Sequence, residues 1–175
     1  TTLWLSLIFE INDKSIYFSG DTAYMEEFKN ITEKYGPFDL AFLDSGQYNV
    51  AWEQVHMLPE QVIQAAVDLN ASVILPIHIS KYELALHHWY EPMELVSTLG
   101  AERNVTVATP MLGSTFILDE EVPQETWWRG VTVCTDPFLN DYPLLEYALI
   151  YINAIGILWI VVPRIKNRNS ISEEE

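Results

Sequence analysis

The sequence has one cysteine and few basic residues, and both shortages exclude classes of protein. Cys134 is the only cysteine among 175 residues, so the chain has no internal disulfide. Lysine and arginine together number 9 against 25 acidic residues, which gives a formal net charge of −16. Because proteins that hold the phosphate backbone need clustered Lys and Arg, the sequence predicts that no nucleic-acid scaffold is a partner.

The sequence also lacks a secretory signal. It opens with TTLWLSLIFEINDK, which has no initiator methionine and no basic region before its apolar residues. These residues begin in the middle of an expected strand, so we expect the natural start to lie upstream and interpret the chain as a fragment. Its length, with 49% apolar and 19% charged residues, is typical of one well-cored globular domain.

Strand-like and helix-like segments alternate between Thr1 and Trp128. Runs of β-favouring apolar residues predict strands, and apolar residues at spacings of three and four predict helices. Strands are expected over 3–10, 15–18, 38–44, 72–80, 105–110 and 114–120, and helices over 22–36, 58–71 and 91–104. This alternation is typical of helices packed on a sheet, so the predicted fold class is α/β.

Three of the expected strands end in side chains that bind metals. Asp21 follows the strand 15–18, Asp44 ends the strand 38–44, and His78 follows the apolar run SVILPI. Because helices return the chain to the same edge of the sheet, we expect these strand ends to converge on one site. Carboxylate and imidazole ligands suit zinc, iron or manganese. Each residue also has a structural interpretation: a helix cap for Asp21, a turn for Asp44 and ordinary packing for His78.

Four sequence blocks in order resemble the second half of a metallo-β-lactamase-fold hydrolase. They are YFSGDTAY, GPFDLAFLDSGQYNVAW, VHMLPEQVIQAAVDL and PIHISKYELALHHWYEP, all within 1–128. The nearest branch in this resemblance contains N-acyl-phosphatidylethanolamine phospholipase D and related bacterial metallohydrolases, and ascorbate-6-phosphate lactonase is more distant. The resemblance implies a four-layer αββα sandwich, of which 1–128 is the C-terminal half.

The resemblance further implies two metal ions, usually zinc, between the edges of two sheets. It assigns Asp21 as the acid that bridges both ions and His78 as a ligand of one. In the family, most other ligands come from a His-x-His-x-Asp-His loop and a further histidine that precede the matched region. The chain lacks that motif, since its histidines are His56, His78, His87 and His88. Because a catalytic zinc generally needs three protein ligands, we expect this chain to be inactive alone.

Other residues are candidates for the surroundings of the metals. His56 and Asp44 are candidates for contacts behind the metal ligands, and a packing or turn role is the alternative for each. His87, His88 and Trp89 are candidates for a wall that faces the substrate. The alternative for these three residues is that they anchor a loop.

The residues after Trp128 have a different composition. We expect a linker over 129–142, an apolar helix over 143–163 and a polar tail over 164–175. The uncharged run YALIYINAIGILWIVV is close to the length that spans a bilayer and carries aromatic residues at its ends, which favours a membrane anchor. A buried helix or a pair of buried strands is the other interpretation. The location therefore stays open between the cytoplasm and a membrane.

Two functions of different classes follow from the sequence. The first is the C-terminal part of a metal-dependent hydrolase, in which metal-activated water cleaves a phosphodiester, phospholipid or lactone bond in a small-molecule or lipid-like substrate. Its first partner is the missing N-terminal half of the same domain. The second is a non-catalytic α/β remnant or interaction module. Because half of a sandwich leaves apolar surface and strand edges open, we expect self-association of the isolated chain.

Overall fold

Residues 5–80, 83 and 85–131 are described by a computed structural model, and they fall within one structural unit, Thr1–Val133. Within these described ranges, no helix has the length and apolar character needed to cross a membrane. The predicted apolar helix 143–163 and polar tail 164–175 lie outside the described residues, as does nearly all of the predicted linker.

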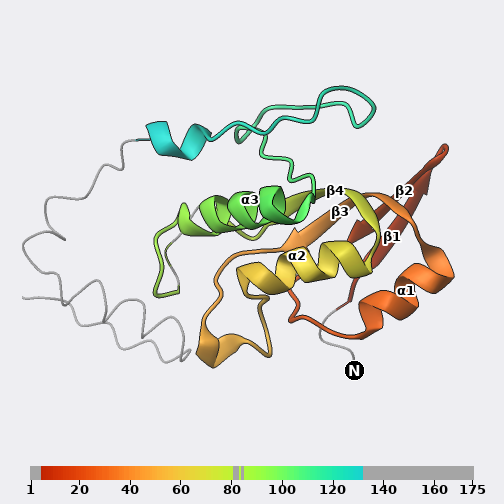
Figure 1. Ribbon diagram of the computed structural model, residues 1–175, viewed down its shortest axis with the longest axis horizontal. Coiled ribbons are helices and arrows are strands. Elements are labelled where there is room, and N and C mark those ends of the chain that lie inside the picture. The colour runs from red at the N-terminus through yellow and green to blue at the C-terminus, as the bar shows by residue number, and fades with distance from the viewer. Residues whose placement is uncertain (1–4, 81–82, 84, 132–175) are drawn as a thin grey trace, which may run out of the picture. The chain divides into compact units, whose positions relative to one another are not determined.

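A four-stranded sheet with strand order β1-β2-β3-β4 is the centre of the fold (Figure 1). Strands β1 (Leu7–Ile11) and β2 (Lys14–Phe18) form an antiparallel hairpin. Strands β3 (Phe38–Asp44) and β4 (Ala71–Ile77) continue the sheet, and β2, β3 and β4 are parallel to one another. Because parallel strands end at the same edge of a sheet, the residues that follow β2, β3 and β4 lie near one another.

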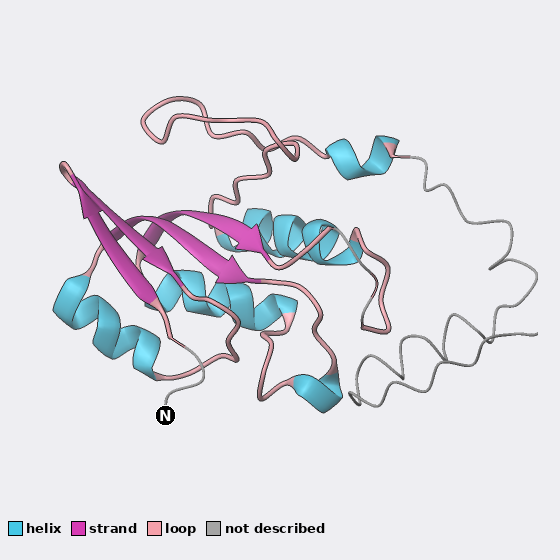
Figure 2. Ribbon diagram, turned by 180° about the vertical axis from the view of Figure 1, so that it is seen from behind, coloured by secondary structure: helices cyan, strands magenta, loops and turns pink. Residues whose placement is uncertain are grey.

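Three helices cover one face of this sheet (Figure 2). They are α1 (Glu27–Tyr35), α2 (Pro59–Asp68) and α3 (Glu91–Arg103). Helix α2 begins at Pro59, whose missing N–H costs nothing in a first turn, and the Gln61 side chain accepts the backbone N–H of Leu58. The predicted α/β class is confirmed, with one sheet and one layer of helices.

A buried apolar cluster holds the helices on the sheet. Tyr17 of β2 meets Phe28 of α1 edge to face, with ring centroids 6.2 Å apart. The large side chains of this core are Tyr17, Phe28, Phe38, Leu43, Met57, Val62, Ile63, Leu69, Ile74 and Val96. Since full burial of one such aliphatic or aromatic side chain contributes about 1.5–3 kcal/mol, this cluster dominates the packing that fixes the strand ends.

The opposite face of the sheet is covered in part by the segment after α3. Its side chains Phe116 and Leu118 pack over Leu40 and Val73. The predicted strands over 105–110 and 114–120 are wrong, because in the described structure this segment joins the sheet only through a bridge between Ile74 and Val107. Pro110 has no N–H to donate to a strand pairing, and the segment covers the sheet with side chains instead.

The first helix is shorter than its predicted range of 22–36. It begins at Glu27, because the residues before it are held as a loop by long-range hydrogen bonds. The Thr22 backbone N–H donates to the side chain of Asp44, and the Tyr24 hydroxyl donates to Asp68 at 2.6 Å. These two contacts place the loop that carries Asp21 against β3 and the end of α2.

Ile63→Ala should lower the free energy of unfolding by about 2–5 kcal/mol, because it opens a cavity under α2 in the fully buried core. Urea unfolding monitored by circular dichroism measures the change. Val67→Ala on the same helix is the matched control, since the Val67 side chain is 52% exposed and its loss should cost no more than about 0.5 kcal/mol. Equal losses for both variants would contradict the described core.

The hydrogen bond between Tyr24 and Asp68 raises the pKa of the Tyr24 hydroxyl to about 12. The stability that this bond supplies is therefore full below about pH 10 and is lost as the pH rises through about 12. Asp68→Asn should lower the pKa of Tyr24 toward its ordinary value. Absorbance titration of the phenolate, taken as the difference from Tyr24→Phe, checks this, and an unchanged pKa would show that Asp68 does not hold the hydroxyl.

Candidate metal centre

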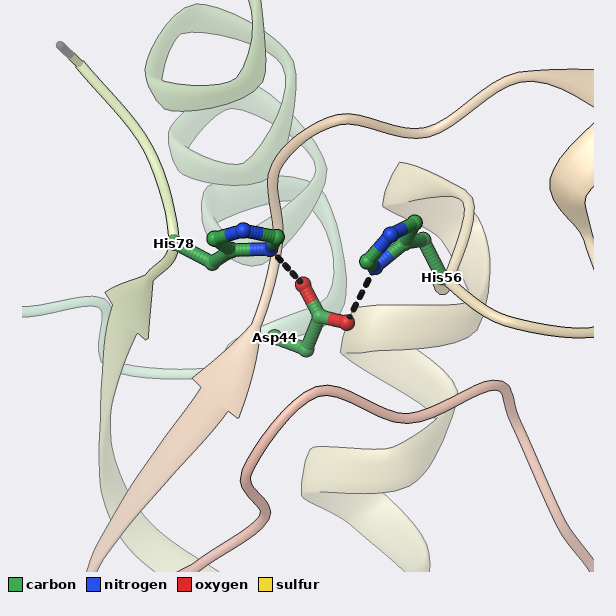
Figure 3. Close-up of side chains that lie close together, drawn as sticks. All are labelled: Asp44, His56 and His78. Atoms are coloured by element: carbon green, nitrogen blue, oxygen red, sulfur yellow. Dashed lines mark hydrogen bonds and ion pairs between the residues drawn. The ribbon is translucent and has the colours of Figure 1, made fainter. Parts of the chain in front are cut away.

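The carboxylate of Asp44, at the end of β3, joins three separate loops. Asp44 is fully buried, with 0% of its surface exposed. Its Oδ2 accepts the backbone N–H of Thr22 at 2.9 Å and lies 2.8 Å from Nδ1 of His56. Its Oδ1 lies 3.4 Å from Nδ1 of His78 (Figure 3). One carboxylate thus contacts the loop after β2, the loop before α2 and the loop after β4.

The contact between Asp44 and His78 shifts the pKa of both residues. Burial acts to raise the pKa of Asp44, but the contacts with His56 and His78 and the N–H of Thr22 outweigh burial and hold the pKa below its ordinary value. The contact with Asp44 raises the pKa of His78 against the opposing effect of burial, and the charge of Asp21 adds to the rise. The buried carboxylate is therefore ionised and favours positive charge on His78.

The donor atoms of the cluster fit a metal ion. Asp44, His56 and His78 each offer one ligand atom, and these atoms lie within 4.8 Å of one another. Oδ1 of Asp44 is buried and has no hydrogen-bond donor among the described residues. Asp21 adds a second carboxylate, with Oδ1 3.8 Å from Nδ1 of His78 and a side chain 52% exposed. Nitrogen and oxygen donors without a thiolate suit zinc, iron or manganese.

The structure brings together four of the residues singled out from the sequence, Asp21, Asp44, His56 and His78. Their gathering agrees with the expected convergence of strand ends at one edge of the sheet. The assignment of Asp21 and His78 as ligands, with His56 and Asp44 behind them, stays a prediction.

Gly46 allows the loop after β3 to pass directly against His78. A Cβ atom at Gly46 would lie 1.9 Å from the backbone oxygen of His78, and Ser45 donates its N–H to the oxygen of Ile77 at 3.1 Å. His78 itself has a φ of 62°, which is uncommon for a residue other than glycine. Sequence reasoning missed this role, and the signal available was a glycine two residues after a strand-ending acid. Gly46 thus lies directly against the backbone of His78, and Ser45 binds the residue before it.

The three residues predicted to form a substrate wall each pack on another aromatic ring. The ring centroids are 4.3 Å apart for His87 and Tyr48, 5.3 Å for His88 and Tyr90, and 6.3 Å for Trp89 and Trp127. The Tyr48 hydroxyl donates to Glu91 at 2.6 Å, which ties the loop after β3 to the start of α3. Sequence reasoning missed Tyr48, because no spacing pattern marks it. A role in facing the substrate stays a prediction for His87, His88 and Trp89.

These features define an α/β protein with a candidate metal centre at the edge where its parallel strands end. A family model described as a beta-lactamase superfamily domain matches residues 1–79, which include Asp21, Asp44, His56 and His78. By this match, residues 1–79 belong to the metallo-β-lactamase superfamily.

Several known proteins are similar in sequence. An uncharacterised protein of Mycobacterium tuberculosis (strain H37Rv) is 38% identical over 132 residues, which is 74% of this chain and 36% of the relative. Outer membrane protein RomA of Klebsiella pneumoniae is 44% identical over 80 residues, 46% of this chain and 61% of the relative. N-acyl-phosphatidylethanolamine-hydrolyzing phospholipase D 1 of Caenorhabditis elegans is 32% identical over 101 residues, 55% of this chain and 28% of the relative.

The fold is also found in a solved structure. Isothiocyanate hydrolase from Delia radicum gut bacteria has a TM-score of 0.50 and 20% sequence identity, and the match covers 64% of this chain and 42% of that protein. At 20% identity, this similarity is evidence for a shared fold and for nothing more specific. The chain spans about a third of the length of the mycobacterial relatives, with 36% covered.

Gly46→Ala should displace the backbone of His78, because the added methyl group cannot occupy the space of a carbonyl oxygen. We expect the free energy of unfolding to fall by about 1–3 kcal/mol. Chemical denaturation measures that change, and the His78 ring resonances in an NMR spectrum report the displacement. Gly130→Ala is the control, since a Cβ there meets no atom within 4 Å. If His78 kept its resonances in Gly46→Ala, the close approach would be wrong.

Proposed function

We propose that this chain is the C-terminal part of a metal-dependent hydrolase. The observation that carries the proposal is the gathering of Asp21, Asp44, His56 and His78 where three strands end. Similarity to a phospholipase D that hydrolyses N-acyl-phosphatidylethanolamine supports a phosphodiester or phospholipid as the substrate, and a lactone is the other bond that fits this chemistry. The substrate is then a small molecule or a lipid.

In this proposal the chain supplies part of a centre for two metal ions. Asp21 and His78 would hold the ions, with Asp21 as the proposed shared ligand, and zinc, iron and manganese all suit these donors. Bound metal supplies a hydroxide near neutral pH by lowering the pKa of a water molecule. Asp44 stays behind the ligands with its contacts to His56 and His78. The half-exposed carboxylate of Asp21 faces solvent, where a cation and a substrate arrive.

The remaining ligands belong to the proposed N-terminal half of the domain. An open apolar patch supports this partner: the β1 side chains Leu7, Phe9 and Ile11 are 42%, 43% and 54% exposed. Leu7 pairs with Phe18, and Phe18 pairs with Phe42, so the open residues of β1 continue the apolar face opposite the helices. A second sheet packed on this face would bury the patch and complete a sandwich. Without it, self-association of the chain through the patch stays our expectation.

A non-catalytic α/β module is the second candidate. It is favoured by the absence of a His-x-His-x-Asp-His segment from the sequence, because the four histidines at 56, 78, 87 and 88 do not form one. Such a module keeps the sheet and its helices and binds no metal through Asp21.

Asp21→Ala should remove metal and hydrolytic activity together in the complete protein, because the proposed bridging ligand is lost. Elemental analysis after extensive dialysis should find about two metal ions per wild-type chain and far less in the variant. Activity is followed with a synthetic phosphodiester.

Asp13→Asn is the matched control, since Asp13 is an exposed acid in the turn between β1 and β2 and its loss should change neither quantity. Full metal content in Asp21→Ala would show that Asp21 is not the bridging ligand. No metal in the wild-type protein would favour the non-catalytic module.

A further inference from the structure

The two histidine rings beside Asp44 present the same nitrogen to it. Nδ1 of His56 lies 2.8 Å from one carboxylate oxygen, and Nδ1 of His78 lies 3.4 Å from the other. Figure 3 shows the two rings on either side of one carboxylate, each with its second nitrogen turned away. The ring centroids are 5.0 Å apart. One acid therefore controls the orientation of two imidazoles.

An ionised carboxylate only accepts hydrogen bonds, so the nitrogen that faces it carries the hydrogen. For a neutral histidine, a hydrogen on Nδ1 leaves the lone pair on Nε2. Among the described residues, no hydrogen bond or ion pair engages Nε2 of His56 or of His78. Both Nε2 atoms are thus left with a lone pair that can bind a cation or accept a proton.

Asp44 could offer a metal ion only its Oδ1, which makes no hydrogen bond among the described residues, so Asp44 is less suited than Asp21 to be a metal ligand. The Oδ2 atom of Asp44 already accepts the N–H of Thr22 and the contact from His56, and the whole residue is buried. A cation bound between the carboxylate and either ring would take the place of the hydrogen on Nδ1. Asp21, by contrast, has a half-exposed side chain, and its Oδ1 lies 3.8 Å from Nδ1 of His78. A carboxylate that holds a histidine by one nitrogen while the other binds metal is a recurrent arrangement in metalloproteins.

We propose that Asp44 is a positioning residue that accepts Nδ1–H of His56 at 2.8 Å, pairs with Nδ1–H of His78 at the ion-pair distance of 3.4 Å, and so sets two Nε2 atoms as the reactive nitrogens of the site. His78 Nε2 is then the metal ligand, a role that rests on the proposed function. His56 Nε2 is a second acceptor beside it, available to a substrate or water hydrogen. Gly46 and the left-handed backbone of His78 fix the position from which His78 reaches the carboxylate.

The first test is the tautomer of each ring in the metal-free full chain. Long-range proton–nitrogen NMR spectra of protein labelled with nitrogen-15 histidine, recorded at a pH where both rings are neutral, distinguish the two forms. We expect the Nδ1–H form for both His56 and His78. In Asp44→Asn at least one ring should change to the Nε2–H form. The amide has only one oxygen, so its NH2 group would face the other ring and require an acceptor nitrogen there. An Nε2–H form of either ring in the wild-type chain would overturn the proposal.

Asp39→Asn is the control for the variant. Asp39 lies at the other end of β3, where its carboxylate accepts the N–H of Ser15 and pairs with Lys14, so its loss should leave both tautomers unchanged. The wild-type spectra decide the proposal even if Asp44→Asn does not fold, which circular dichroism would reveal.

The second test uses Co²⁺ binding to the complete protein, followed by visible absorption. Asp44→Asn should weaken Co²⁺ binding about 10- to 100-fold, the usual effect of losing a carboxylate behind a ligating histidine, without changing the number of ligands that the absorption bands report. Loss of one oxygen ligand in the variant would make Asp44 a direct ligand and contradict the positioning role. Absence of Co²⁺ binding in the wild type would instead defeat the proposed function, and the tautomers would still decide the role of Asp44.

Discussion

The buried negative charge of Asp44 is the constraint on which the arrangement of the site depends. Removing a carboxylate from water costs several kcal/mol unless hydrogen bonds and opposite charges compensate. Here the compensation comes from Thr22, His56 and His78, which belong to three loops far apart in the sequence. Those loops must therefore meet at the end of β3, and the meeting brings the half-exposed Asp21 to the same place. The stability of the loops and the chemistry of the site rest on the same contacts.

The two carboxylates of the site have different surroundings, and this difference separates their functions in the proposal. Asp44 is enclosed and contacts three loops, whereas Asp21 retains solvent contact. An enclosed acid suits orientation of neighbouring rings, because its partners cannot be exchanged for water. An exposed acid suits a cation that enters from solution. Aromatic stacking of Tyr48 on His87 and the hydrogen bond from Tyr48 to Glu91 connect the loop after Asp44 to the start of α3, so the same strand end also orders the neighbouring loop.

Much of the fold was predictable from the sequence because it depends on local patterns. The apolar run of β3 predicts its bounds, Phe38–Asp44, and the alternation of strands and helices predicts parallel strands whose ends converge. The central place of Asp44 was not predictable, because a strand-ending acid before Ser-Gly is equally typical of a turn. The start of α1 depends on contacts of Thr22 and Tyr24 with distant residues, which no periodicity reveals. The segment after α3 has strand-like composition, yet it covers the sheet with side chains.

A crystal structure of the complete protein with bound zinc, with the ions located by anomalous scattering, tests the central claim most directly. We predict a zinc ion about 2.0–2.2 Å from a carboxylate oxygen of Asp21 and from Nε2 of His78, with Asp44 still contacting Nδ1 of both rings. Zinc bound to Asp44 itself, or zinc far from the ends of β2, β3 and β4, would contradict the account.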